Sequence, residues 1–218
     1  MTSFNTELFF TSSYGTILSK SDGTITGTAP IFTLSSSTGH VRQLVKTGNF
    51  VYLSTYNFYP SQGGLWKSDG TATGASLLKS FDTEPTFLFP MGNLLYFSEF
   101  SAIDGFELGK SDGTVTGTQK VKVFSQSSQG YFPIPLAVIG DKYYCTADDA
   151  SGVNSVWVTD GTAANTTAIA TIIPANTSAQ RDWPFPAQSG NLIFSSERRD
   201  TRIRALADGR NTRWHIYG

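Results

Sequence analysis

Few side chains in this chain could take part in catalysis, and the carboxyl groups are the first candidates. Most glycoside hydrolases use two Asp or Glu side chains that flank the scissile bond. The short first strand predicted below for each repeat carries no acid. The acids nearest to those strands are Glu84, Glu99, Asp104 and Asp182. Glycoside hydrolysis is therefore the enzymatic alternative, and we expect a protein without catalytic activity.

Metal chemistry has little support in the residue types. His40 and His215 are the only two histidines and lie far apart in the chain, which argues against a histidine-based metal site. Asp148 and Asp149 could contribute to Ca²⁺ binding. That ion takes about 6–8 oxygen ligands, and the loop lacks the spaced acids of a known calcium site. We expect no cofactor and no metal site.

Aromatic side chains next to polar ones, on connections of variable length, point to binding. Loops held by a rigid scaffold commonly carry function, and exposed aromatic rings beside Asp, Asn and Arg suit sugars or peptide surfaces. The alternative for each ring is packing between sheets, and Phe58 belongs to the same set of loop aromatics. The predicted ligand-binding residues are Tyr14, Tyr59, Phe100, Asp104, Tyr131, Asp148, Asp149, Arg181 and Trp183.

The scaffold for these loops is a repeat marked by Asp-Gly. Five aspartates recur at intervals of 47, 43, 48 and 48 residues, which is the mark of a repeat architecture. Asp-Gly favours a hairpin turn, so we assign these residues to structure. The turn residues are Asp22, Gly23, Asp69, Gly70, Asp112, Gly113, Asp160, Gly161, Asp208 and Gly209. Five residues after the first four aspartates stand Gly27, Gly74, Gly117 and Asn165, for which we expect positive φ angles.

Each repeat contains four strand-like segments and no convincing helix. A short apolar run precedes a Gly-Asn or Gly-Asp turn, an aromatic strand follows, and two further strands flank the Asp-Gly turn. Four-stranded units of this length favour an all-β, five-bladed β-propeller, a single domain over residues 1–218. An open array of blade-like repeats from a longer protein is the alternative. The repeats span approximately residues 1–34, 41–81, 86–124, 134–173 and 183–217.

The amino-acid composition limits the classes of possible binding partner. The net charge is −1, so no global field recruits nucleic acid, and no apolar run reaches the roughly 18 residues of a membrane span. Seven of the eight arginines lie in the last 38 residues, which we interpret as drift of the last repeat. Cys145 is the only cysteine, so an internal disulfide is excluded. The first residues lack the basic start and apolar segment of a signal peptide.

The repeat resembles a known family. Leu65-Trp-Lys-Ser-Asp-Gly-Thr-Ala-Thr-Gly and Val156-Trp-Val-Thr-Asp-Gly-Thr-Ala-Ala-Asn are similar to the ELWxxDGT repeat, and Ala147-Asp-Asp-Ala-Ser-Gly152 is similar to that repeat's Ala-Asp-Asp-Gly segment. The family consists of long arrays in secreted or surface-exposed, mainly bacterial proteins, some called hyalin-like. The last copy, Ala207-Asp-Gly-Arg210, lacks the Trp and Thr. The resemblance implies an extracellular or cell-surface repeat protein without catalysis.

Together these observations predict a module that binds a glycan or a protein through the face formed by its variable connections. The alternative is a structural subunit that self-associates or assembles into a larger surface structure or filament. An enzyme of the glycosidase type is the third hypothesis.

Overall fold

The computed structural model describes residues 1–4, 6–35, 39–58, 61–126, 130 and 132–173, and five strand segments beyond them at 187–188, 192–193, 195–198, 201–208 and 211–217. The chain divides into two compact units, Met1–Val123 and Phe124–Gly218. We describe each unit by itself.

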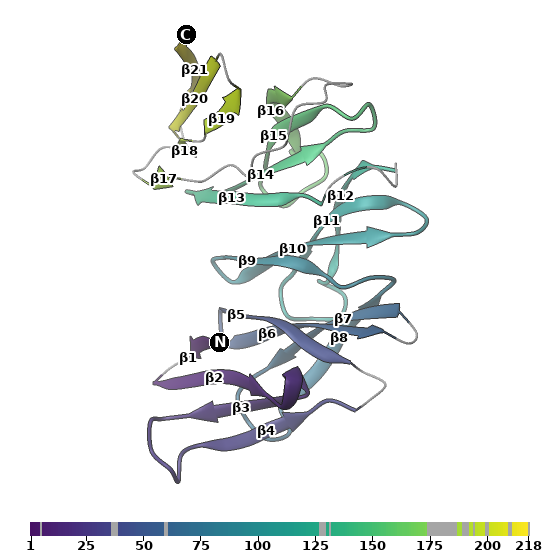
Figure 1. Cartoon of the computed structure of the whole chain (residues 1–218), viewed down its shortest axis with the longest axis vertical. Coiled ribbons are helices and arrows are strands. Elements are labelled where there is room, and N and C mark those ends of the chain that lie inside the picture. Colours follow the sequence, from purple (N-terminus) through teal and green to yellow (C-terminus); the bar gives the residue numbers. More distant parts are fainter. Residues whose placement is uncertain are drawn as a thin grey trace. The chain divides into compact units, whose positions relative to one another are not determined.

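The first unit is built from antiparallel sheets of four strands, each formed by strands consecutive in the chain (Figure 1). The first sheet contains β1 (Thr2–Phe4), β2 (Glu7–Ser12), β3 (Ile17–Ser21) and β4 (Ala29–Thr33). The second contains β5 (His40–Thr47), β6 (Phe50–Phe58), β7 (Ser61–Ser68) and β8 (Ala75–Phe81). The third contains β9 (Thr86–Met91), β10 (Leu94–Ser101), β11 (Gly105–Ser111) and β12 (Gln119–Ser125), whose last residues lie past the division between the units. The three sheets span residues 2–33, 40–81 and 86–125.

The second unit repeats the pattern once and then departs from it. Its four-stranded sheet contains β13 (Ile134–Ile139), β14 (Lys142–Asp148), β15 (Asn154–Thr159) and β16 (Thr167–Ile173). The last sheet has five strands instead of the predicted four, because two separate segments replace the predicted second strand and both pair with β20. These strands are β17 (Ala187–Gln188), β18 (Leu192–Ile193), β19 (Ser195–Arg198), β20 (Thr201–Asp208) and β21 (Asn211–Tyr217).

The second strands of the second, third and fourth sheets (β6, β10 and β14) are buried on both faces, which explains their largely apolar sequences. Within β6, Val51 and Leu53 pack with Phe9 and Leu18 of the first sheet. Tyr52, which points to the opposite face, packs in a cluster that reaches the third sheet. Alternate residues of β6 therefore join neighbouring sheets face to face. The all-β prediction with four-stranded, blade-like antiparallel sheets is confirmed, while five blades in a closed ring stay a prediction.

Two kinds of turn recur among the described residues: a two-residue Gly-Asn or Gly-Asp hairpin in the second, third and fourth sheets, and an Asp-Gly-Thr turn in the first four sheets. The Gly-Asn and Gly-Asp pairs form the predicted two-residue hairpins, with positive φ at Gly48, Gly92 and Gly140. In the Asp-Gly-Thr turns, one carboxylate oxygen accepts hydrogen bonds from the backbone N–H and the hydroxyl of the Thr two residues later. For Asp69 these bonds to Thr71 measure 2.9 and 2.7 Å. The same pair of bonds occurs at Asp22, Asp112 and Asp160.

These bonds stabilise the charged carboxylates. The backbone and hydroxyl donors of the Thr lower the pKa of Asp22, Asp69 and Asp112. At Asp160 the Thr162 hydroxyl, the Asn165 amide and the Thr162 backbone N–H together lower the pKa to about 2. In these four turns the carboxylate of the Asp therefore stabilises the turn itself. Asp208 ends β20, and its side chain and Gly209 lie outside the described residues.

The prediction of positive φ at the position five residues after the Asp is wrong. Positive φ falls instead on the Gly that follows the Asp directly, for example 87° at Gly70. Gly27, Gly74 and Gly117 are required for space, because a Cβ atom there would overlap the carboxylate of its own turn. In the fourth turn Asn165 uses its side chain differently and donates a 2.6 Å hydrogen bond to Asp160 Oδ2.

Candidate functional site

The connection between β2 and β3 forms a short turn, η1 (Ser13–Gly15), with an unusual backbone. Ser13, Tyr14 and Gly15 all have positive φ, at 51°, 59° and 87°. Such angles are strained for the two residues that carry a Cβ, and strain of this kind gathers at functional sites. The turn leaves the Tyr14 side chain 98% exposed. Gly15 has no room for a side chain, because a Cβ atom there would lie 2.8 Å from the backbone oxygen of Val41.

The start of β5 lies against this turn. His40 Nδ1 is 3.0 Å from the backbone oxygen of Tyr14. A carbonyl oxygen can only accept, so Nδ1 carries the proton and donates, which leaves Nε2 as an acceptor in the neutral ring. Arg42 follows at a β-bulge, since the pairing register with β6 shifts between Val41 and Gln43. A bulge re-aims a side chain out of the normal alternation of the strand.

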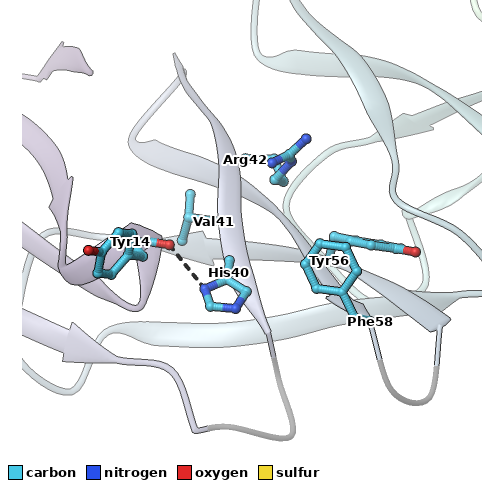
Figure 2. Close-up of a pocket in the computed structure, with 6 residues that line it drawn as sticks. All are labelled: Tyr14, His40, Val41, Arg42, Tyr56 and Phe58. Atoms are coloured by element: carbon cyan, nitrogen blue, oxygen red, sulfur yellow. Dashed lines mark hydrogen bonds between the residues drawn. The ribbon is translucent and has the colours of Figure 1, made fainter.

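Two aromatic residues at the end of β6 complete the site. Tyr56 and Phe58 meet edge to face with ring centroids 5.0 Å apart, and the Phe58 side chain is 60% exposed. The Tyr56 hydroxyl lies 3.1 Å from Ser61 Oγ. With η1 and the start of β5 they surround an open hollow of about 280 Å³, shown in Figure 2. Its lining is Tyr14, His40, Val41, Arg42, Tyr56 and Phe58.

The charge of the hollow comes from Arg42. Its Nε lies 3.4 Å from Glu84 Oε2, while its side chain remains 58% exposed. The Glu84 side chain is only 19% exposed, and its Oε1 accepts a long hydrogen bond of 3.5 Å from Ser54 Oγ. Burial raises the pKa of Glu84, and Arg42 opposes that rise. None of the described residues that line the hollow is acidic.

The structure brings few of the predicted ligand residues together. Tyr14 lines the hollow, whereas Phe100 packs on Phe106 with ring centroids 4.9 Å apart. Asp104 pairs with Lys120 at 2.5 Å. Asp148 is 1% exposed. It accepts a hydrogen bond from Asn154 Nδ2, and Asp149 accepts two from the backbone N–H groups of its own loop. The remaining predicted residues, Tyr59, Tyr131, Arg181 and Trp183, lie outside the described residues.

A second cluster of titratable groups lies in the third sheet. Glu99 on β10 and Glu107 on β11 are directly opposite each other, and they are only 4% and 3% exposed. Lys120 Nζ is 3.2 Å from Glu107 Oε1, and Lys79 Nζ is 3.7 Å from Glu99 Oε1. Burial raises the pKa of Glu99 to about 7, against the opposing charge of Lys79. Burial also raises the pKa of Glu107, although the hydrogen bond from Lys120 opposes it. Neither carboxyl lines the hollow.

Cofactor and membrane features can be stated for the described residues only. Among them, no three or more His, Cys, Asp or Glu side chains gather as a metal-binding group. The same part of the chain contains no helix with the length and apolar character needed to cross a bilayer.

The sequence analysis points to Tyr14 and Phe58 but not to the other four lining residues, His40, Val41, Arg42 and Tyr56. His40 had been considered only as a metal ligand, and Arg42 and Tyr56 were not singled out. Arg42 is the single arginine outside the last 38 residues, and this isolation is the only sequence feature that distinguishes it from the other arginines. Nothing local in the sequence marks the bulge that presents its side chain.

Comparisons with known proteins bear on the fold alone. No family model and no curated protein matches the chain. The structure is similar to an uncharacterized protein from Listeria monocytogenes EGD-e, with a TM-score of 0.55 and 13% identity over 94% of this chain and 60% of that one. It is also similar to a prolyl endopeptidase structure, with a TM-score of 0.50 and 16% identity over 96% of this chain and 35% of the other. The chain thus spans less than two thirds of either neighbour.

Proposed function

We propose that this protein is a non-catalytic binding module that holds a glycan in the hollow between η1, β5 and β6. The observation that carries the proposal is that two exposed aromatic residues, Tyr14 on a strained turn and Phe58 at the end of β6, line a hollow that also contains polar side chains. Sugar rings offer apolar C–H faces that stack on aromatic rings and hydroxyls that bind polar groups. A site with both features suits such a ligand.

The position of the hollow supports the same function. Its residues lie at or next to the β2–β3, β4–β5 and β6–β7 connections, which are the segments that differ most between repeats. The paired carboxyls Glu99 and Glu107 are buried and outside the lining, so the hollow brings no such pair to a substrate. With the resemblance to the ELWxxDGT repeat, the proposal extends to an exported protein at the cell surface or outside the cell.

A glycan array probed with the labelled full chain tests this proposal. We expect binding to a defined set of oligosaccharides, which Tyr14→Ala and Phe58→Ala each weaken. Ile103→Ala is the matched control, since Ile103 is 86% exposed and outside the hollow. An array without any bound glycan, together with self-association of the pure chain in mass photometry, would favour a structural subunit instead. Capture of a protein ligand that Phe58→Ala abolishes would keep the site but change its ligand class.

A further inference from the structure

The end of the Arg42 guanidinium is the most specific feature of the hollow. Its Nε forms an ion pair with Glu84 Oε2 at 3.4 Å, and its two terminal nitrogens contact no other partner in the described part of the chain. A guanidinium presents its donors as a planar fork, and the terminal edge matches the two oxygens of a carboxylate. The contact with Glu84 therefore orients the group and leaves the edge that binds a carboxylate accessible.

The surroundings favour an anion over a neutral group. Among the described residues that line the hollow there is one cation and no acid, and the side chain of Glu84, the partner of Arg42, is only 19% exposed. The rings of Tyr56 and Phe58 offer stacking surfaces in the hollow, while Tyr14 lines its other side with its phenol directed away from them (Figure 2). His40 adds a ring nitrogen, Nε2, that makes no hydrogen bond with the described residues. A ligand that satisfies all these groups carries a carboxylate next to an apolar face and a hydroxyl.

We propose that the hollow selects acidic sugars, with a uronic-acid carboxylate on the terminal edge of Arg42 and the sugar ring against the aromatic side chains. This inference rests on the proposed glycan-binding function and names its ligand class. With a neutral sugar bound, the terminal edge of the guanidinium would have only water as a partner. An acidic peptide would supply the carboxylate but not the saturated ring that suits the flat aromatic surfaces.

The test compares each acidic sugar with its own methyl ester, because esterification removes the charge and keeps the ring. Oligomers of galacturonate, glucuronate and mannuronate are placed on one array beside their methyl esters, neutral oligosaccharides and an Asp/Glu-rich peptide. We expect the full chain to bind at least one acid about tenfold more tightly than its ester, as for a hydrogen-bonded charge pair. Equal binding of acid and ester would overturn the inference.

Substitutions test whether Arg42 is the residue that produces the preference for acidic sugars. Arg42→Gln should weaken binding of the acid about tenfold and leave binding of the ester unchanged, because only the acid has a carboxylate that pairs with the guanidinium. Lys46→Gln is the matched control, since it removes a positive charge from the same strand outside the hollow. If Arg42→Gln lowers the melting temperature by leaving Glu84 unpaired, Arg42→Gln/Glu84→Gln removes both charges and should show the same loss of preference. An acid preference that survives in both variants would refute the assignment to Arg42.

The outcomes separate this inference from the proposed function. Binding of neutral glycans that Phe58→Ala abolishes, without preference for acids, would leave the function standing and refute the charge selection. Binding of the acidic peptide alone would refute the sugar class. No binding to any glycan would refute both.

Discussion

Glu99 gives a direct test of the electrostatics of the third sheet. Its carboxyl is 4% exposed, faces Glu107 across the β10–β11 ladder, and has a pKa raised from 4.5 to about 7. A pKa raised in the folded state means that folding favours the protonated form. Stability from this group is therefore fully present below pH 4.5 and is lost as the pH rises through about 7.

The magnitude follows from linkage. One pKa unit corresponds to about 1.4 kcal/mol, so the unfolding free energy should lose about 2–3 kcal/mol between pH 5 and pH 8 through Glu99. Lys79, at 3.7 Å, partly compensates the buried charge. Glu99→Gln keeps the size of the side chain and removes the titration. The variant should therefore be more stable than the wild type at pH 8 by about 2–3 kcal/mol relative to their difference at pH 5.

Urea unfolding at pH 5, 6.5 and 8, followed by fluorescence and by circular dichroism, measures this difference. Glu7→Gln is the control, because it makes the same substitution in a partly exposed ion pair with Lys20, away from the Glu99 cluster. If wild type and Glu99→Gln differ by the same free energy at all three pH values, Glu99 does not exchange a proton in this range. The reasoning from burial would then be wrong.

Three further predictions concern the turns, the core and the last repeat. Gly74→Ala should lower the melting temperature, because its Cβ would overlap the Asp69 carboxylate, and the loss should be smaller in an Asp69→Ala background. Additive losses in that double-mutant cycle would refute the steric explanation. The Cys145 thiol is 1% exposed and burial raises its pKa, so a thiol reagent should react with it only after unfolding. Fast reaction of the native chain would contradict this burial. In hydrogen exchange, amides of residues 190–217 should exchange faster than those of residues 93–124, since the last turn lacks the Thr that holds the other turns. Equal protection would show that other contacts close the last repeat.

Part of the fold was predictable because its causes are local. Gly48-Asn49 requires only two residues to reverse the chain, and Asp69 with Thr71 closes a turn through bonds between near neighbours. The role of Gly74 was mistaken for a related reason. Positive φ and a lack of space both select glycine, and the sequence alone does not distinguish them.

The hollow was only partly predictable because it joins segments far apart in the chain. Tyr14 was found as a loop aromatic. His40 and Arg42 reach the site through the close approach of β5 to η1, and Tyr56 through its pairing with His40. Phe100 was chosen on the same grounds as Tyr14, yet it packs on Phe106. Loop position alone does not separate rings that face solvent from rings that pack.

The sequence by itself determined the strand period, the hairpins and the Asp-Gly-Thr turns, because each depends on hydrogen bonds and backbone angles within a few residues. The tertiary structure decided which side chains meet. Val51 and Tyr52 are adjacent in β6 but belong to clusters on opposite faces of the second sheet. Arg42 is aimed by a bulge that exists only in the pairing with β6, and Glu99 acquires its raised pKa only when folding buries it opposite Glu107. These properties arise from burial and from contacts between distant segments, which local sequence does not encode.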